Sequence, residues 1–177
     1  EILLTSGSSG FSIKEVVERA GLSTATIYRR WPTVHDLILE GIRSLVPEPV
    51  PIDAGSLKAD ITAFIDQFGG ALLSVAGLYA ADRRDSGIDP RLREEIRNSF
   101  VEPRLELLGT ILERAQGEGE LGSLPKVEEC WDFVAGPIHH RLLIRGESFT
   151  EEYAARTSAV IVASLMVLSD VSSGKDR

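Results

Sequence analysis

The chain has 177 residues, of which 43% are hydrophobic and 26% are charged, and a formal net charge of −8 at pH 7. These values are typical of a folded globular protein with a proper core, in one domain or in a small domain and a larger one. A single cysteine, Cys130, excludes an internal disulfide and a cysteine-based zinc site. The longest apolar run, residues 159–168, is too short to cross a bilayer and no secretory signal opens the chain, so we expect a cytoplasmic protein with no membrane partner.

The acidic charge is unevenly distributed along the sequence. Residues 1–46 hold five basic and five acidic residues, so the whole acidic excess lies in residues 47–177. From Arg19 to His35 there are three arginines and no acid. A locally basic tip on an acidic body can still bind phosphates, with a strong dependence on salt.

Residues 12–31, SIKEVVERAGLSTATIYRRW, have the pattern of two short helices joined by a turn. Ser12 and Glu15 form the S-x-x-E pattern of a capping box, which predicts that the first helix begins there. Gly21 stands where a helix commonly ends in a left-handed residue. The sequence therefore predicts a helical hairpin with a sharp turn after the first helix.

The second helix can be capped by Ser23 or Thr24 and should end near Trp31, because the proline that follows disfavours helical geometry at the residue before it. A helical wheel places Ile27 and Trp31 inward. So short a helix is not stable alone, which indicates that its polar side is presented for a purpose. We expect DNA contacts from small, hydroxyl and basic side chains at the helix starts and on the outer side: Ser12, Ser23, Thr24, Ala25, Thr26, Tyr28, Arg29 and Arg30.

The chemistry of these side chains suits a duplex. Small and hydroxyl residues allow the start of a helix to enter a major groove, where a threonine methyl can contact thymine and Arg29 can contact guanine. Tyr28, Arg30, Ser12 and the backbone amides at the helix starts suit phosphates. The alternative interpretation is a well-capped helical hairpin that binds no DNA.

This stretch closely resembles the N-terminal DNA-binding domain of TetR-type (tetracycline-repressor-like) transcriptional regulators. The shared pattern here is Ser12, Ala20-Gly21, Leu22-Ser23, Tyr28 and Trp31-Pro32, followed by Leu37. The family often has a phosphate-binding lysine two residues after the proline. This chain has Val34 at that position, with His35 beside it as a weak substitute.

The resemblance implies an all-α fold. A three-helix N-terminal domain, whose first helix ends within Glu1–Ser6, would be followed by a larger helical domain for effector binding and dimerisation. The stretch Pro47–Gly55 has three prolines and cannot continue a helix. We therefore expect a helix-turn-helix domain in residues 1–46, a proline-rich connector in 47–56 and a helical domain in 57–177.

Apolar spacing predicts the helices of the body over residues 57–79, 91–100, 104–116, 127–144 and 151–170. The helix over 127–144 has two apolar faces, and the second face implies another layer, either within the chain or on a partner. The resemblance implies a homodimer through the last two helices, whereas the alternative is one large core that hides both. The interface residues that we expect are Phe133, Pro137, Ile144, Ala159, Ala163 and Val167.

Aromatic and histidine side chains of the body are candidates for a ligand pocket, although such aromatics are more often plain core. The candidates are Phe64, Phe68, Tyr79, Phe100, Trp131, His139 and His140. The resemblance implies that a small apolar or amphipathic effector binds the body and changes the separation of two DNA-binding domains.

No catalytic chemistry is expected. Cys130 and His139 lie half a turn apart around their helix, and Glu129 and His140 are about 16 Å apart along its axis. No metalloprotease, nucleophile-elbow or phosphate-loop motif is present. We therefore predict no catalytic residue, no metal, no cofactor and no enzyme, but a ligand-responsive repressor that binds a pseudo-palindromic double-stranded operator. The rival hypothesis is a helical ligand-binding or interaction protein that no longer reads DNA.

Overall fold

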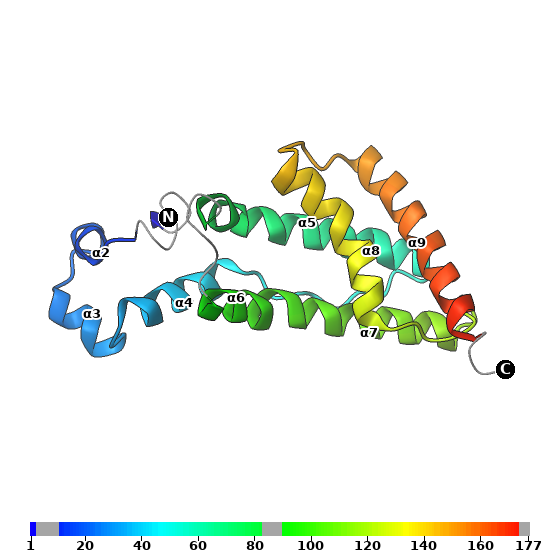
Figure 1. Cartoon of the computed structure of the whole chain (residues 1–177), viewed down its shortest axis with the longest axis horizontal. Helices are drawn as coiled ribbons and strands as arrows, with labels where there is room; N and C mark the ends of the chain where they lie inside the picture. Colours follow the sequence, from blue (N-terminus) through cyan, green and yellow to red (C-terminus); the bar gives the residue numbers. More distant parts are fainter. Residues whose placement is uncertain (3–10, 83–89, 174–177) are drawn as a thin grey trace. The chain divides into compact units, whose positions relative to one another are not determined.

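The computed structural model describes residues 1–2, 11–82 and 90–173, and only the backbone of 76–82, 91–92 and 172–173. Every regular element in these ranges is a helix, which confirms the all-α prediction (Figure 1). Most of the predicted first helix, Glu1–Ser6, lies outside the described residues.

Contacts between residues divide the chain into two units. Unit 1 comprises Glu1–Pro47 and Leu73–Phe100, and unit 2 comprises Glu48–Leu72 and Val101–Arg177. The long helix α5 (Leu57–Asp82) therefore begins in unit 2 and ends in unit 1. This division groups part of the predicted C-terminal domain with the N-terminal helices, and the predicted domain boundaries stay predictions.

Unit 1 contains a short helical hairpin followed by a longer helix: α2 (Ile13–Ala20), α3 (Thr24–Arg30) and α4 (Val34–Leu45). Gly21 ends α2 in the left-handed region, with φ 65°, as predicted. The predicted capping box at the start of α2 is wrong, because the Ser12 side chain makes no capping hydrogen bond. Glu15 instead pairs with Arg19 one turn along the same helix, at 2.7 Å.

Helix α4 is fixed at its start by a capping box. The Asp36 backbone N–H donates to Thr33 Oγ1 at 3.1 Å, and the Thr33 N–H donates to an Asp36 carboxylate oxygen at 2.9 Å. Ile38 and Ile42 are its buried residues. Unit 1 also contains helix α6 (Pro90–Ile96), which packs against α4.

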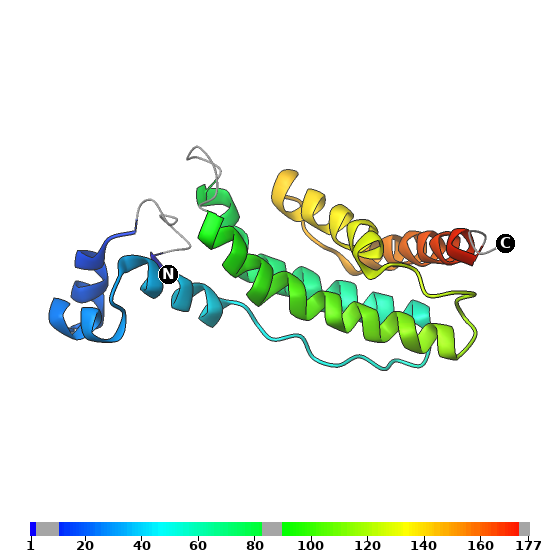
Figure 2. The ribbon, with the colours of Figure 1, turned by 60° about the horizontal axis from the view of Figure 1, so that its bottom comes forward.

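The connector has no regular structure over residues 48–54 of unit 2 and leads into the start of α5 (Figure 2). The Gln67 side chain holds it there, because it accepts from the Val50 N–H at 2.9 Å and donates to the Val50 carbonyl at 3.0 Å. A side chain of α5 therefore satisfies the backbone polar groups of Val50, which no helix or strand of the connector pairs.

A π-helix, η1 (Arg97–Val101), joins α6 directly to α7 (Glu102–Gly117). The prediction of two separate helices over residues 91–100 and 104–116 is therefore wrong, because the helical path continues between them. Pro103 lies in the first turn of α7, directly after the π-turn of η1, and it does not end the helical path.

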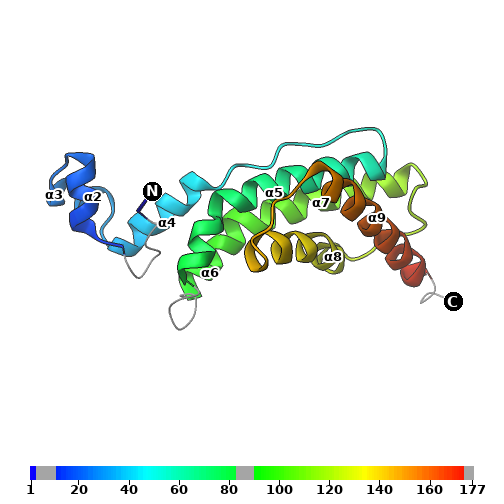
Figure 3. The ribbon, with the colours of Figure 1, turned by 90° about the horizontal axis from the view of Figure 1, so that it is seen from above.

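The last helices of unit 2 are α8 (Val127–His139), the π-helix η2 (His140–Ile144) and α9 (Glu151–Ser173). Helix α8 packs against both α7 and α9 (Figure 3). Pro137 lies inside α8, one turn before the helix widens into η2. The segment Glu151–Val171 is long and apolar enough to cross a membrane, but the core helix of a soluble protein passes the same test.

Candidate DNA-binding surface

Helix α3 is held in place by a cap and one buried side chain. The Ser23 Oγ accepts from the Thr26 N–H at 3.1 Å, which settles the choice between Ser23 and Thr24 as the N-cap. Ile27, 2% exposed, is its buried residue. The helix ends where the Trp31 N–H donates to the Ile27 carbonyl at 2.9 Å. A seven-residue helix anchored in this way presents its remaining side chains outward.

The outward side of α3 carries the predicted DNA-binding residues. Thr24, Ala25, Arg29 and Arg30 are exposed, and Tyr28 is 42% exposed. Thr26 is half-buried, and its hydroxyl lies 2.9 Å from that of Ser23.

Two arginines of α3 are available to bind anions. Within the described part of the chain, neither Arg29 nor Arg30 forms an ion pair with a carboxylate, whereas Lys14 and Arg19 of α2 pair with glutamates one turn away. The Arg30 guanidinium lies 4.9 Å from the centre of the Trp31 ring, an arrangement that orients it without neutralising it. The positive charge of the hairpin is therefore concentrated on α3.

The other two predicted contacts have contrasting surroundings. Ser12 is exposed at the start of α2, and the missing cap bond leaves its hydroxyl for an outside partner. His35 is half-buried and its Nε2 atom is buried without a hydrogen-bond partner. A nitrogen so enclosed does not contact a phosphate in this conformation, and this weighs against His35 as the substitute for the family's lysine.

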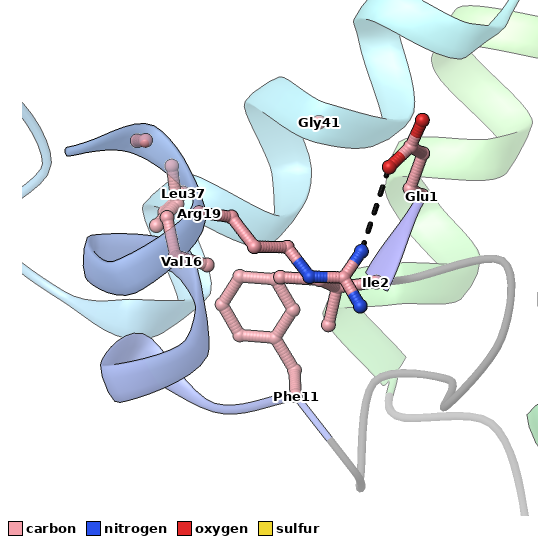
Figure 4. A pocket seen from close by; sticks show the side chains of 8 residues that line it. Glu1, Ile2, Phe11, Val16, Arg19, Leu37 and Gly41 are labelled. Atoms are coloured by element: carbon pink, nitrogen blue, oxygen red, sulfur yellow. Dashed lines mark hydrogen bonds and ion pairs between the residues drawn. The ribbon is translucent and has the colours of Figure 1, made fainter.

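The hairpin also borders an apolar pocket that no sequence motif indicated. Its volume is about 380 Å³, and it is lined by Ile2, Phe11, Val16, Ala20, Leu37 and Gly41. Figure 4 shows the Phe11 ring beside α2, with Arg19 donating to the Glu1 carboxylate at 3.4 Å. Residues 3–10, which follow Ile2 in the sequence, lie outside the described part of the chain.

Four of the predicted pocket residues form one aromatic cluster in unit 2. The Phe68 ring centre lies 6.4 Å from that of Phe64, 5.2 Å from that of Trp131 and 5.4 Å from that of His139. Of the other predicted pocket residues, Phe100 is buried in unit 1 and His140 is exposed, while the side chain of Tyr79 is not among those that the structure describes.

His139 brings a polar atom into this cluster. Its Nδ1 lies 3.0 Å from the Ala135 carbonyl, which can only accept, so Nδ1 carries the proton. Burial lowers the pKa of His139, although the bond to the carbonyl opposes this. The ring is therefore neutral at pH 7, with Nε2 as its acceptor.

The second apolar face of α8 is open in the single chain. Phe133 is 48% exposed and Ile144 is 56% exposed, whereas Val134 and Ile138 on the other face are buried. A groove of about 310 Å³ between α8 and α9 is lined by Phe133, Pro137, Tyr153, Val160 and other residues. Along α9, Ala159, Ala163 and Val167 are exposed. All six predicted interface residues thus lie on the outside of unit 2 or at this groove.

The fold and the exposed hairpin define a helix-turn-helix DNA-binding transcriptional regulator, and comparisons with known proteins agree. Residues 51–161 match the family described as the tetracyclin repressor-like C-terminal domain. The chain belongs to the TetR-type family of transcriptional regulators. Members of this family bind DNA and normally have no catalytic activity. Within the described residues, no group of three or more histidine, cysteine, aspartate or glutamate side chains is placed to hold a metal ion.

Individual relatives cover most of the chain. It is 31% identical, over 155 residues, to the uncharacterised HTH-type transcriptional regulator YdeS of Bacillus subtilis, covering 86% of this chain and 78% of the relative. It is 29% identical to the DNA-binding transcriptional repressor TetR of Mycobacteroides abscessus, covering 82% and 78%. The crystal structure of the TetR family regulator SCO0332 matches with a TM-score of 0.59 at 23% identity, over 92% and 91% of the two chains, and shows the fold alone.

Proposed function

We propose that this regulator is a repressor: two copies bind a pseudo-palindromic operator, and a small effector releases them. The observation that carries the proposal is the outward side of α3, where exposed hydroxyl and guanidinium groups stand on a helix anchored by Ile27. A helix of this kind fits a major groove, and its unpaired arginines fit guanine edges and phosphates. A relative that is named a repressor supports this direction of control. A regulator of this kind acts in the cytoplasm, where the DNA is.

DNA binding is tested by selecting an operator from random duplexes with the purified protein and measuring affinity at several salt concentrations. Arg29→Ala should relax the preference at one base pair by about 1–3 kcal/mol, whereas Tyr28→Ala should weaken binding to all sequences alike. Lys126→Ala, which removes an exposed basic side chain of unit 2, is the matched control. It should change neither the base preference nor the overall affinity. An unchanged base preference in the Arg29 variant would show that this residue does not read bases.

Dimerisation through α8 and α9 is the second part of the proposal. It is supported by the exposed apolar residues of both helices, because a single chain gains nothing from an apolar face in water. Apolar residues face outward along α9 at helical spacing, including Val160 at 66% and Val167 at 61% exposed. Two copies of such a pair of helices form a four-helix interface with twofold symmetry.

Sedimentation velocity at micromolar concentration tests the dimer. Val167→Arg places a charge in the proposed interface and should give a monomer that keeps its helix content. Val50→Arg, which places the same charge on the exposed connector, should remain a dimer. A wild-type monomer would refute the dimer.

The aromatic cluster around Phe68 is the proposed effector site. Aromatic faces suit a planar, apolar effector, and the neutral His139 ring offers it a polar contact without a charge. The chain has two tryptophans, so the Trp31→Phe variant leaves Trp131 as the only indole reporter. Small aromatic compounds that quench its fluorescence should also release the selected operator. Quenching without release of the operator would show that a compound binds at the aromatic cluster but does not control DNA binding.

A further inference from the structure

One arginine organises the turn between η2 and α9, residues 145–150. The Arg141 Nε donates to the Ser148 carbonyl at 2.8 Å, and an Nη nitrogen lies 2.8 Å from a Glu147 carboxylate oxygen. The guanidinium also lies over the Tyr153 ring, 4.0 Å from the ring centre. The Arg141 side chain is only 20% exposed. This residue therefore holds the turn and the beginning of α9 together.

The ring of Phe149 seats the same turn on helix α5 (Figure 3). One ring carbon lies 3.5 Å from the point that a Cβ atom at Gly69 would occupy, so a larger side chain there would displace the ring. Gly69 is buried and directly follows Phe68, the centre of the aromatic cluster. His139, another member of the cluster, is two residues before Arg141. Both attachments of the turn are therefore close in the chain to the proposed effector site.

The turn also reaches the proposed dimer interface. The ring centres of Phe149 and Tyr153 are 5.4 Å apart, in an edge-to-face arrangement. Tyr153 in turn lines the groove between α8 and α9, together with Phe133 and Pro137. Closely packed side chains transmit small displacements, since there is little empty space to absorb them. A shift of Phe149 should therefore change the position of Tyr153 in the groove.

We propose that the turn of residues 145–150 links the packing of the aromatic cluster to the strength of dimerisation. The proposal rests on the proposed function, which supplies both the effector site and the dimer. Arg141, Phe149 and Tyr153 are positioning residues in this link. An effector that repacks the cluster then changes the dimer dissociation constant, and dimerisation changes the affinity for the effector by the same factor.

The first test places the same side chain at two neighbouring positions of α5. Gly69→Leu fills the space of the Phe149 ring, whereas a Cβ atom at Gly70 meets no atom within 4 Å among the residues that the structure describes. Gly70→Leu is the matched control, because it brings the same gain in helix propensity. Sedimentation velocity over a range of concentrations should show the dimer dissociation constant raised at least about fivefold in Gly69→Leu, the low end of coupling between sites, and unchanged in Gly70→Leu.

A pair of arginine variants tests the link without adding volume to the core. Arg141→Lys keeps the charge but loses the bond from Nε to the Ser148 carbonyl and the planar contact with Tyr153. It should raise the dissociation constant in the same direction as Gly69→Leu. Arg145→Lys is the control, since Arg145 is 57% exposed and a lysine can keep its ion pair with Glu147. Circular dichroism should show unchanged helix content in both.

The link is also tested from the side of the cluster. Phe68→Leu shrinks the centre of the cluster beside Gly69 and should change the dissociation constant, although Phe68 is buried and lies away from the groove between α8 and α9. Phe64→Leu makes the same change one turn earlier in α5, at an equally buried residue, and should change the constant less. Equal changes would indicate a general loss of core packing and would contradict the link.

These outcomes separate failure of the link from failure of the proposed function, and none of them depends on DNA. A wild type that stays monomeric would refute the dimer, and the link with it. A wild-type dimer whose dissociation constant is the same in Gly69→Leu and Arg141→Lys would overturn the link alone.

Discussion

The α2–α3 hairpin and the core of unit 2 are built in opposite ways. Helix α2 has no buried residue and α3 has one, whereas α7 alone buries five. The hairpin is held by caps, a left-handed glycine and Ile27, and it leaves its polar side open. Unit 2 encloses even charged groups, such as Asp60 and Arg104. The proposed DNA-reading surface is therefore built on little buried area, whereas unit 2 encloses a larger core.

The largest expected effect is a loss of stability caused by a substitution in unit 2. Asp60 is fully buried and forms an ion pair with Arg114, which also pairs with Asp53 at 2.7 Å. Arg114→Ala leaves the buried Asp60 carboxylate without its cation and should cost about 3–5 kcal/mol of unfolding free energy, measured by urea denaturation. Lys126→Ala breaks an exposed pair and should cost at most about 1 kcal/mol. Equal losses of unfolding free energy in the two variants would contradict the expected difference between a buried and an exposed ion pair.

The hairpin should be most sensitive at its single anchor. Ile27→Ala removes the buried side chain of α3 and should destabilise unit 1 by about 2–5 kcal/mol, the range for such truncations in a core. Because unit 2 keeps its own core, circular dichroism should show most of the helix content retained while operator binding is lost. Full unfolding of the chain would show that the two units do not differ in this way.

A smaller effect is expected at the cap of α3. Ser23→Ala removes the acceptor for the Thr26 N–H and should cost about 1 kcal/mol of stability. Ser23→Gly should cost less, since glycine is tolerated at this position. Thermal denaturation followed at 222 nm measures both, and a cost that is larger for glycine than for alanine would contradict the assigned cap.

The smallest expected effect is on the pH dependence of stability, and it arises from a histidine in unit 2. Burial lowers the pKa of His139, so the unfolded chain takes up a proton there at a higher pH than the folded chain. Stability from this residue is full above the ordinary histidine pKa of about 6.5 and falls as the pH drops through the lowered value. Urea denaturation at pH 7.5 and 5.5 should therefore show a smaller loss in His139→Gln than in the wild type. Equal losses would place the pH dependence elsewhere.

Local patterns predicted the hairpin well, because caps and turns depend on neighbouring residues. Gly21, the Ser23 cap and the outward side of α3 follow from the order of side chains over a few positions. The capping box at Ser12 failed although its pattern was correct, because Glu15 instead pairs with Arg19 on the same helix. A side chain with two partners within reach is not assigned by spacing alone.

Only the tertiary structure revealed what distant residues do together. Arg43 and Glu95 are 52 positions apart, and no local pattern pairs them. The helical path continues through η1 between the two helices that were predicted over residues 91–100 and 104–116. Likewise, the sequence indicated two apolar faces on α8, but packing decided which of them the single chain buries. The sequence determined the helices and the side chains that they offer outward, while the fold decided which of those side chains meet, because burial and ion pairing depend on distances that the chain reaches only when it is folded.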